Sequence, residues 1–170
     1  MPSITTKPRL LDRAIADFIE SGEISLYVAG CDTQRRPRAT RAFGCCVSPE
    51  TQSVTTWVSR AAAPALLDDI SSNGRLALVA SHVETCRTFQ LKAVDAEVVP
   101  IDSADYARVV AYHDAFIEQT LRMGYPESML RSMMQYRFDK LAAIVFTPSA
   151  VFAQTPGPGA GERLAGEPIP

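Results

Sequence analysis

The sequence lacks the motifs of the commonest nucleotide-binding and hydrolytic enzymes. It contains no GxGxxG, P-loop or GxSxG pattern. The residues on which dinucleotide-binding folds and serine hydrolases usually depend are therefore missing. No apolar run approaches the roughly 20 residues of a membrane span. The net charge of −2 gives no overall field that attracts nucleic acid. We therefore expect neither a membrane nor a nucleic-acid partner.

Cysteine is also scarce, and its spacing excludes the common metal motifs. The four cysteines form no CxxC pair. Cys45 and Cys46 are neighbours on an expected strand, so their side chains leave opposite faces and cannot share one ligand. Since the segment from Met1 to Arg9 is too polar for a signal peptide, we expect a soluble cytoplasmic protein with reduced thiols and no disulfide. Most of the cysteines are read as small buried hydrophobes, and no metal is expected.

Four helices are predicted around a β-rich middle. Leu11, Ile15, Phe18 and Ile19 repeat at helical spacing over 11–20. Residues 61–72 follow with Ser59 as the expected N-cap, and a long helix runs from Asp102 or Ser103 to Gly124. Pro126 opens a Met-rich helix. The length of 170 residues suits one domain over 1–154, followed by a C-terminal tail over 155–170. The Pro- and Gly-rich run Thr155–Gly161 is expected to form no regular structure and to be either a disordered tail or a coil held against another surface.

Alternating or continuous apolar runs predict six strands. They cover Ile24–Cys31, Arg38–Val47, Val54–Ser59, Leu76–Ala80, Arg87–Val99 and Leu141–Gln154, the last interrupted at Pro148. Turn residues separate most of these runs, and the long helices are inserted late in the chain. This order predicts a mainly β, α+β fold: a six-stranded antiparallel barrel with peripheral helices.

The fifth predicted strand carries polar side chains on one face. Thr88, Gln90 and Lys92 alternate with Phe89, Leu91 and Ala93. Since alternate residues of a strand point to opposite faces, a hydroxyl, an amide and an ammonium line up in front of an apolar layer. This layout is typical of a barrel wall that holds a polar ligand.

Positive charge gathers in the β part of the chain. The cluster consists of Arg35, Arg36, Arg38, Arg41, Arg60, Arg75, Arg87 and Lys92. In a nearly neutral protein it is consistent with a local anion site, because guanidinium groups bind phosphate well, and equally with a solvated sheet surface. We retain Arg41, Arg60 and Lys92 as candidates and expect Arg35 and Arg36, in a turn, to be only solvated.

Other candidate residues have a functional and a structural interpretation. Trp57 is able to stack on a ligand ring, but a lone tryptophan on a strand is more often core. His82 and Cys86, four apart across a loop, are half of a metal or haem site or a plain turn. His113 fits a core or interface histidine. The stripe of Met129, Met133 and Met134 fits packing, a dimer interface or an adaptable pocket.

Four segments and the chain's ending carry a resemblance to a known family. They are Pro37–Gly44 (PRATRAFG), Thr56–Arg60 (TWVSR), Asn73–Val79 (NGRLALV), Arg87–Val98 (RTFQLKAVDAEV) and Val151–Gly161 (VFAQTPGPGAG). Together they resemble the pyridoxamine 5′-phosphate oxidase-like proteins with the FMN-binding split barrel. The resemblance implies a six-stranded split barrel that pairs with a second copy of itself, with FMN in each groove between subunits.

The resemblance also implies roles for eight residues. Arg41 would meet the FMN phosphate and Arg60 would close over it. The strand edge formed by Thr56, Trp57, Val58 and Ser59 would run along the isoalloxazine ring with its backbone. Gln90 and Lys92 would approach from the fifth strand. The catalytic residues are not identified, because the hydride chemistry belongs to the cofactor.

The sequence departs from the family at two phosphate-binding places. Where true oxidases have a lysine after the strand-two arginine, this chain has Phe43 or Cys46, and the Ser-Arg-Lys run becomes Arg60 followed by three alanines. Each lost charge-assisted hydrogen bond costs roughly 1.5 to 3 kcal/mol, so FMN binding should be weakened by orders of magnitude. Pyridoxamine phosphate oxidation is not expected.

Two functional hypotheses follow. The first is a homodimeric FMN-dependent oxidoreductase or reductase acting on a small, cyclic or conjugated substrate. The second is a non-catalytic split barrel that holds haem, a deazaflavin or another ligand, or serves mainly as a dimeric module. The basic face motivates the first hypothesis, and the missing phosphate donors motivate the second.

Overall fold

The computed structural model describes residues 10–167. Its helices are α1 (Arg13–Glu20), α2 (Pro64–Asn73), α3 (Ser103–Arg122) and α4 (Glu127–Met133), with a 3-10 turn at Phe138–Lys140. Its strands are β1 (Ile24–Cys31), β2 (Pro37–Val47), β3 (Val54–Ser59), β4 (Leu76–His82), β5 (Thr88–Ala93), β6 (Glu97–Val99), β7 (Leu141–Phe146), β8 (Ala150–Ala153) and β9 (Arg163–Gly166). The expectation about Met1 to Arg9 lies outside the described residues.

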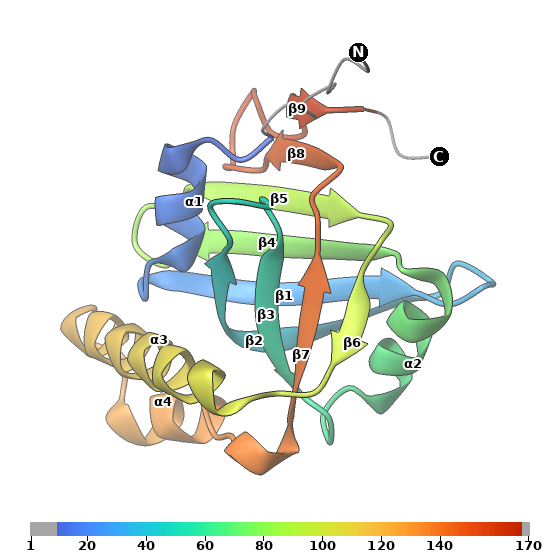
Figure 1. Cartoon of the computed structure of the whole chain (residues 1–170). Helices are drawn as coiled ribbons and strands as arrows, with labels where there is room; N and C mark the ends of the chain where they lie inside the picture. The colour runs from blue at the N-terminus through green and yellow to red at the C-terminus, as the bar shows by residue number, and fades with distance from the viewer. Residues whose placement is uncertain (1–9, 168–170) are drawn as a thin grey trace.

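The strands form one antiparallel sheet that curls on itself. Their order is β6-β7-β3-β2-β1-β4-β5-β8-β9. Strands β3, β6 and β7 cross in front of β1, β4 and β5, so the sheet makes a half-barrel (Figure 1). The helices lie around its rim, with α2 on the opposite side from α1 and α3. Among the described residues, no helix is both long and apolar enough to cross a bilayer.

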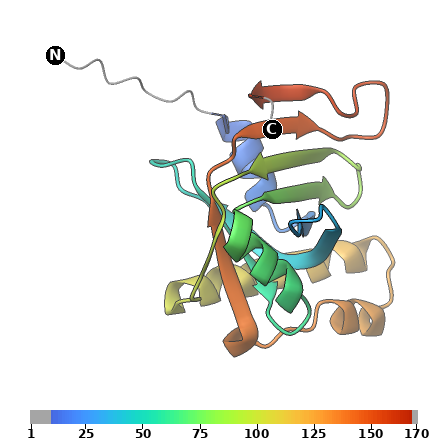
Figure 2. The same ribbon diagram turned by 90° about the vertical axis from the view of Figure 1, so that its right-hand side faces the viewer.

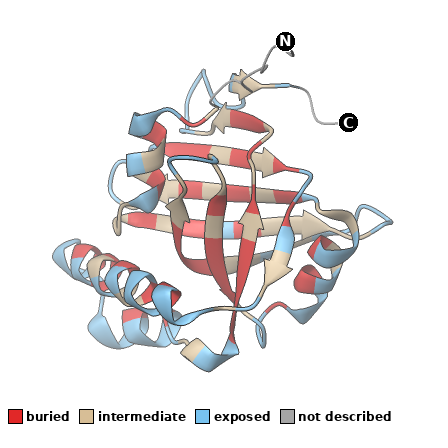
Figure 3. Cartoon of the chain, in the orientation of Figure 1, coloured by how far each residue is buried: buried red, intermediate tan, exposed pale blue. Residues whose placement is uncertain are grey.

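The hydrophobic core fills the space between the two crossing halves of the sheet. Alternation along β1 buries Ile24, Leu26 and Val28 completely, and Trp57 and Phe146 enter from β3 and β7 with at most 1% of their surface exposed. Buried residues follow both halves of the sheet, and the helices bury only the stripe that faces it (Figure 3). A predicted mainly β fold is therefore confirmed.

Two predicted strands are each divided in the structure. The run over Arg87–Val99 splits into β5, which pairs with β4, and β6, which pairs with β7 at the far end of the sheet. The run over Leu141–Gln154 splits into β7 and β8 in the same way. The β5–β6 and β7–β8 connections turn the barrel corner side by side. There the Thr147 amide donates to the Asp95 carboxylate at 3.0 Å. The predicted six strands are therefore too few.

The Pro- and Gly-rich run Thr155–Gly161 contains no helix or strand, as expected, but the residues beyond it form β9, a strand that was not predicted. Strand β9 pairs with β8 through Ala150–Gly166, Val151–Ala165 and Phe152–Arg163. Gly166 has φ +88°, and a Cβ there would lie 2.1 Å from the Ser149 carbonyl oxygen. The absence of a Cβ at Gly166 is thus what lets the chain approach β8 so closely.

Helix ends follow the expected capping chemistry except at α2. Asp12 caps α1, and Asp102 and Asp105 form a reciprocal capping box at α3. Helix α2 starts at Pro64 rather than Ala61, because proline suits the first turn of a helix. The predicted N-cap Ser59 instead accepts the amide of Ala62 at 3.3 Å, in the turn before the helix.

Tyr112 ties α3 to the start of the sheet and gives a pH-dependent prediction. Its hydroxyl donates to the Ile24 carbonyl at 2.7 Å, and burial raises the pKa of this phenol. Tyr112→Phe should lower the free energy of unfolding by about 1 kcal/mol at neutral pH. Because the folded pKa exceeds the unfolded value of about 10, the wild type loses this advantage as pH rises above 10, while the variant has nothing to lose.

The measurement is urea denaturation of both proteins at pH 7 and at pH 10.5. The stability difference between them should shrink at the higher pH. A difference that stays constant would show that the Tyr112 hydroxyl ionises alike in the folded and unfolded states.

Candidate functional site

On the outer side of the sheet, no helix lies over β5 and β8 (Figure 2). A row of paired side chains crosses this side, and Phe116 of α3 and Met133 of α4 border it at Arg41. Pairing in register places Arg41 beside Tyr27, Tyr27 beside Val79, Val79 beside Gln90 and Gln90 beside Phe152. Directly paired residues point to the same face of a sheet, so these five side chains share what we call the outer face. Arg41 and Gln90 are three strand spacings apart, about 14 Å.

Arg41 is held among neutral groups on the outer face. Its guanidinium donates to the Tyr27 hydroxyl at 2.7 Å and to the Ser25 hydroxyl at 3.2 Å. Its Cζ lies 4.8 Å from the centre of the Tyr27 ring and 5.6 Å from that of Phe116, and Nη2 lies 3.6 Å from the sulfur of Met133. Cation–π contacts fix the orientation of a guanidinium without neutralising it. Arg41 therefore keeps its positive charge available for an anion.

Strand β5 alternates as predicted. Phe89, Leu91 and Ala93 are buried, with at most 6% exposed, while Gln90 and Lys92 are only partly buried on the outer face. The apolar layer behind Gln90 and Lys92 is confirmed.

The polar side chains of β5 retain donors for a ligand. Gln90 accepts a hydrogen bond from Gln154 at 3.3 Å through its carbonyl oxygen, which orients its amide nitrogen away from that bond. The ammonium of Lys92 lies 4.8 Å from the centre of the Phe152 ring. Thr88 differs, because it is 8% exposed and its hydroxyl is hydrogen-bonded within the β4–β5 hairpin.

A groove of about 320 Å³ lies at the far end of the same strands. Small residues, Ala29, Gly30 and Ala77, line it together with the cationic side chains of Arg75 and Lys92. Small side chains leave room for a flat group to approach the sheet, and the cations favour a negative charge. The groove is able to accept part of a planar anionic ligand.

Strand β3 contributes buried structure and not a free edge. Thr56, Trp57 and Val58 are completely buried, and the Thr56 hydroxyl donates to the Gly44 carbonyl at 2.8 Å. The strand is paired on both sides, with β2 and with β7, because β7 returns to the sheet after the two long helices. The expected edge is therefore absent, and the core interpretation of Trp57 is confirmed.

Ser59 and Arg60 lie next to Arg41. Ala42 pairs with Val58, so Arg41 and Ser59 are the residues immediately beyond this pair on β2 and β3. Arg60 is exposed, and its Nε donates to the Leu141 carbonyl at 3.3 Å. Two of the retained cations thus come from the middle of β2 and from the residue that follows β3.

The basic cluster divides into paired and unpaired charges. Asp32 lies 2.6 Å from Arg36, and Asp69 lies 2.6 Å from Arg38, so these two arginines are neutralised on the surface. Within residues 10–167, no carboxylate approaches within 4 Å of the three retained cations, which are Arg41, Arg60 and Lys92.

The positions expected to lack phosphate donors do lack them. Phe43 is 5% exposed and packs on Tyr136, with ring centres 5.4 Å apart. Burial raises the pKa of the Cys46 thiol, which keeps it neutral. Ala61 and Ala62 are exposed methyl groups beside Arg60. A phosphate in this region would rely on Arg41, Arg60 and backbone amides.

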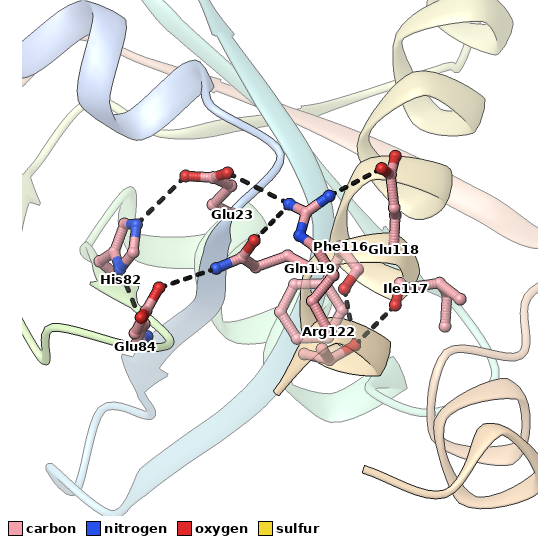
Figure 4. Close-up of polar contacts among 9 residues, drawn as sticks. Glu23, His82, Glu84, Phe116, Ile117, Glu118, Gln119 and Arg122 are labelled. Atoms are coloured by element: carbon pink, nitrogen blue, oxygen red, sulfur yellow. Dashed lines mark hydrogen bonds and ion pairs between the residues drawn. The ribbon is translucent and has the colours of Figure 1, made fainter. Parts of the chain in front are cut away.

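His82 belongs to a polar network that joins the β4–β5 hairpin to α3 (Figure 4). Its Nε2 lies 3.2 Å from the carboxylate of Glu23, while Nδ1 accepts the amides of Glu84 and Thr85 at 3.3 and 3.2 Å. With both ring nitrogens engaged, neither is free to bind a metal. No group of three or more metal-ligating side chains exists in the described part of the chain, so the plain-turn interpretation fits His82 better.

The remaining candidates have structural surroundings. His113 is partly buried beside Tyr136, with ring centres 5.4 Å apart, as expected for a packed histidine. Burial raises the pKa of Cys45 well above its usual value, and its thiol donates to the Ile19 carbonyl. Met134 is fully buried, but Met129 and Met133 are 44% and 40% exposed. Packing therefore explains one of the three methionines.

Sequence reasoning missed Tyr27, Phe152 and Ser25 as members of the outer face. Their alternation with buried neighbours on β1 and β8 was the available signal. What brings them to Arg41 and Gln90 is strand pairing between distant parts of the chain.

Comparison with known proteins identifies the fold. No known family model matches the sequence, and no curated protein is similar to it. Three solved structures cover most of the chain: an F420 reductase (11% identity, TM-score 0.53, 83% of this chain and 98% of that chain), a provisionally assigned pyridoxamine 5′-phosphate oxidase from Lactobacillus delbrueckii (15%, 0.52, 87% and 98%) and HupZ from Group A Streptococcus (15%, 0.51, 89% and 99%). The chain has the split-barrel fold of the pyridoxamine 5′-phosphate oxidase-like proteins.

Proposed function

We propose that this split barrel is a homodimeric flavin-binding protein, with FMN lying along the outer face in a groove shared by two copies. The observation that carries the proposal is the set of three cations, Arg41, Arg60 and Lys92, without a carboxylate partner in the described chain on or beside an uncovered, partly apolar sheet face. Half-buried cations are usually paired in proteins, so the unpaired Arg41 and Lys92 favour an anionic ligand, and the exposed Arg60 adds positive charge beside Arg41.

The residues present suit the two ends of a flavin. Arg41 in the middle of β2 and Arg60 just after β3 would hold the phosphate, with Ser59 between them. Gln90 and Lys92 would face the polar edge of the ring system from about 14 Å away across the strands. The role of the rest of β3 would be indirect. Its buried residues Thr56, Trp57 and Val58 would support the position of β2, which carries Arg41, without contacting the ligand.

The second copy is needed to close the site. Tyr27 is 42% exposed on the outer face, and Val79 and Phe152 are only partly buried there. One subunit covers one side of a ligand on this face, whereas ligand sites normally enclose most of their ligand. A twofold pairing of outer faces would bury these apolar side chains and supply the second wall.

The flavin, when bound, supplies hydride transfer, and the protein's part is to bind, orient and exclude water. The chain's own groups that can do so are Arg41 and Arg60 for the phosphate, and Gln90 and Lys92 for the ring. We propose an oxidoreductase or reductase on a small cyclic or conjugated substrate.

The missing phosphate donors set the expected affinity. Two fewer charge-assisted hydrogen bonds, at roughly 1.5 to 3 kcal/mol each, predict FMN binding in the micromolar range instead of the nanomolar range. The F420 reductase among the similar structures keeps a deazaflavin as an alternative ligand. Haem is less favoured, because both nitrogens of His82 have partners.

Titration with FMN, followed by quenching of flavin fluorescence, tests the proposal. Saturable quenching with a micromolar dissociation constant is the expected result. Absence of quenching up to millimolar FMN would remove the flavin from the account and leave a split barrel for another ligand.

A further inference from the structure

A small apolar pocket adjoins Arg41. It lies between α3 and α4 and has a volume of about 230 Å³. Its lining includes Phe116 from α3, Tyr125 from the connection, and Met129, Leu130 and Met133 from α4. We call it the α3–α4 pocket.

Two residues of this pocket also touch the Arg41 guanidinium. The sulfur of Met133 is 3.6 Å from Nη2, and the Phe116 ring centre is 5.6 Å from Cζ. Arg41 therefore lies where the outer face meets the α3–α4 pocket. An anion on Arg41 would have the groove of the outer face on one side and an apolar pocket on the other.

The size of the α3–α4 pocket indicates what it holds. Pockets that enclose a whole ligand usually have volumes of about 300 to 1,000 Å³, so about 230 Å³ suits one part of a ligand anchored elsewhere. Tyr125, Met129 and Met133 are 48%, 44% and 40% exposed. Exposed methionines adapt to flat apolar groups, and an exposed tyrosine can stack on them.

We propose that the α3–α4 pocket binds an aromatic group joined to the flavin through the phosphate that Arg41 holds. The ligand would then be a flavin dinucleotide, in which a pyrophosphate joins the flavin part to a second ring system. This inference rests on the proposed function and specifies which flavin the site prefers.

The charge of the ligand does not separate a mononucleotide from a dinucleotide here. A phosphate monoester carries about −1.5 to −2 charges at neutral pH, and the two phosphates of a dinucleotide carry about one each. What distinguishes the dinucleotide is its second ring system, whose burial in the α3–α4 pocket would add to the affinity.

Parallel titrations with FMN and FAD, followed by flavin fluorescence anisotropy, test the inference in the full-length protein. Met129→Gln changes the α3–α4 pocket without touching Arg41. Met123→Gln is the matched control, because Met123 is 36% exposed and does not line the pocket. Wild type and the Met123 variant should bind FAD at least about tenfold more tightly than FMN. The Met129 variant should lose most of this preference with unchanged FMN affinity.

Each other outcome counts against the inference in a distinct way. Equal affinities for FMN and FAD in the wild type would overturn it and leave the proposed function standing. Equal weakening of both flavins by Met129→Gln would do the same. A Met129 variant that sediments as a monomer would assign the pocket to the subunit contact. Binding of neither flavin would overturn both proposals.

Discussion

Arg41→Ala is expected to weaken FMN binding by roughly 10- to 100-fold, whereas Arg36→Ala should leave it within about twofold. The charge-assisted bond that the first variant removes is worth roughly 1.5 to 3 kcal/mol. Arg36 is 68% exposed and already paired with Asp32 at 2.6 Å, so its removal takes nothing from the outer face. Fluorescence titration of both variants beside the wild type gives the comparison.

The control for this experiment is folding. Arg41 donates to two hydroxyl groups that are also accessible to water or to other partners, so its loss should cost the folded state at most about 1 kcal/mol. Arg41→Lys keeps the charge but loses the planar donor pair, and it should give an intermediate affinity. Equal affinities of Arg41→Ala and Arg36→Ala for FMN would show that the phosphate does not lie at Arg41.

The largest effect on stability is expected from Gly44→Ala, which should lower the free energy of unfolding by about 2 to 5 kcal/mol. Gly44 lies at the irregularity of β2 between Ala42 and Cys45, with φ +109°. A Cβ there would lie 3.0 Å from the Cβ of Tyr112 and 3.3 Å from the Trp57 ring. Backbone strain and overpacking therefore add.

Gly124→Ala separates the two causes. Gly124 also has a positive φ, +87°, but nothing lies within 4 Å of a Cβ built there. Its substitution should cost only the backbone term, about 1 kcal/mol. Denaturant unfolding of both variants measures the difference. Equal losses would mean that the core between β2 and α3 accommodates a methyl group and that its packing is looser than the structure indicates.

The comparison of sequence with structure shows which signals are local. The helices were predictable because apolar spacing and capping residues, such as the Asp102 and Asp105 pair, act within a few positions. The divisions near Asp95 and Thr147 were not, because the chain stays extended through both corners and only its pairing partner changes. Strand β9 was not predictable either, because its regular structure depends on pairing with β8 and not on its own sequence pattern.

The site residues likewise divide into those with a local sequence signal and those that only the fold brings together. Alternation on β5 predicted which side chains face outward, and none of the three cations retained from the basic cluster has a carboxylate partner among the described residues. The pattern of β3 did not reveal that both its neighbours are strands, since a strand buried on both faces shows no simple alternation. The contact of Arg41 with Met133 joins residues 92 positions apart and is visible only in the fold.

Sedimentation velocity of the protein equilibrated with FMN, recorded at the flavin absorbance and at the protein absorbance, shows whether two subunits hold the flavin between them. We expect flavin to sediment with a dimer at one flavin per subunit, and we expect Arg41→Ala to leave the dimer but lose the flavin signal at the same concentrations. Flavin that sediments with a monomer, or a dimer that carries no flavin at saturating FMN, would contradict a ligand held between two outer faces.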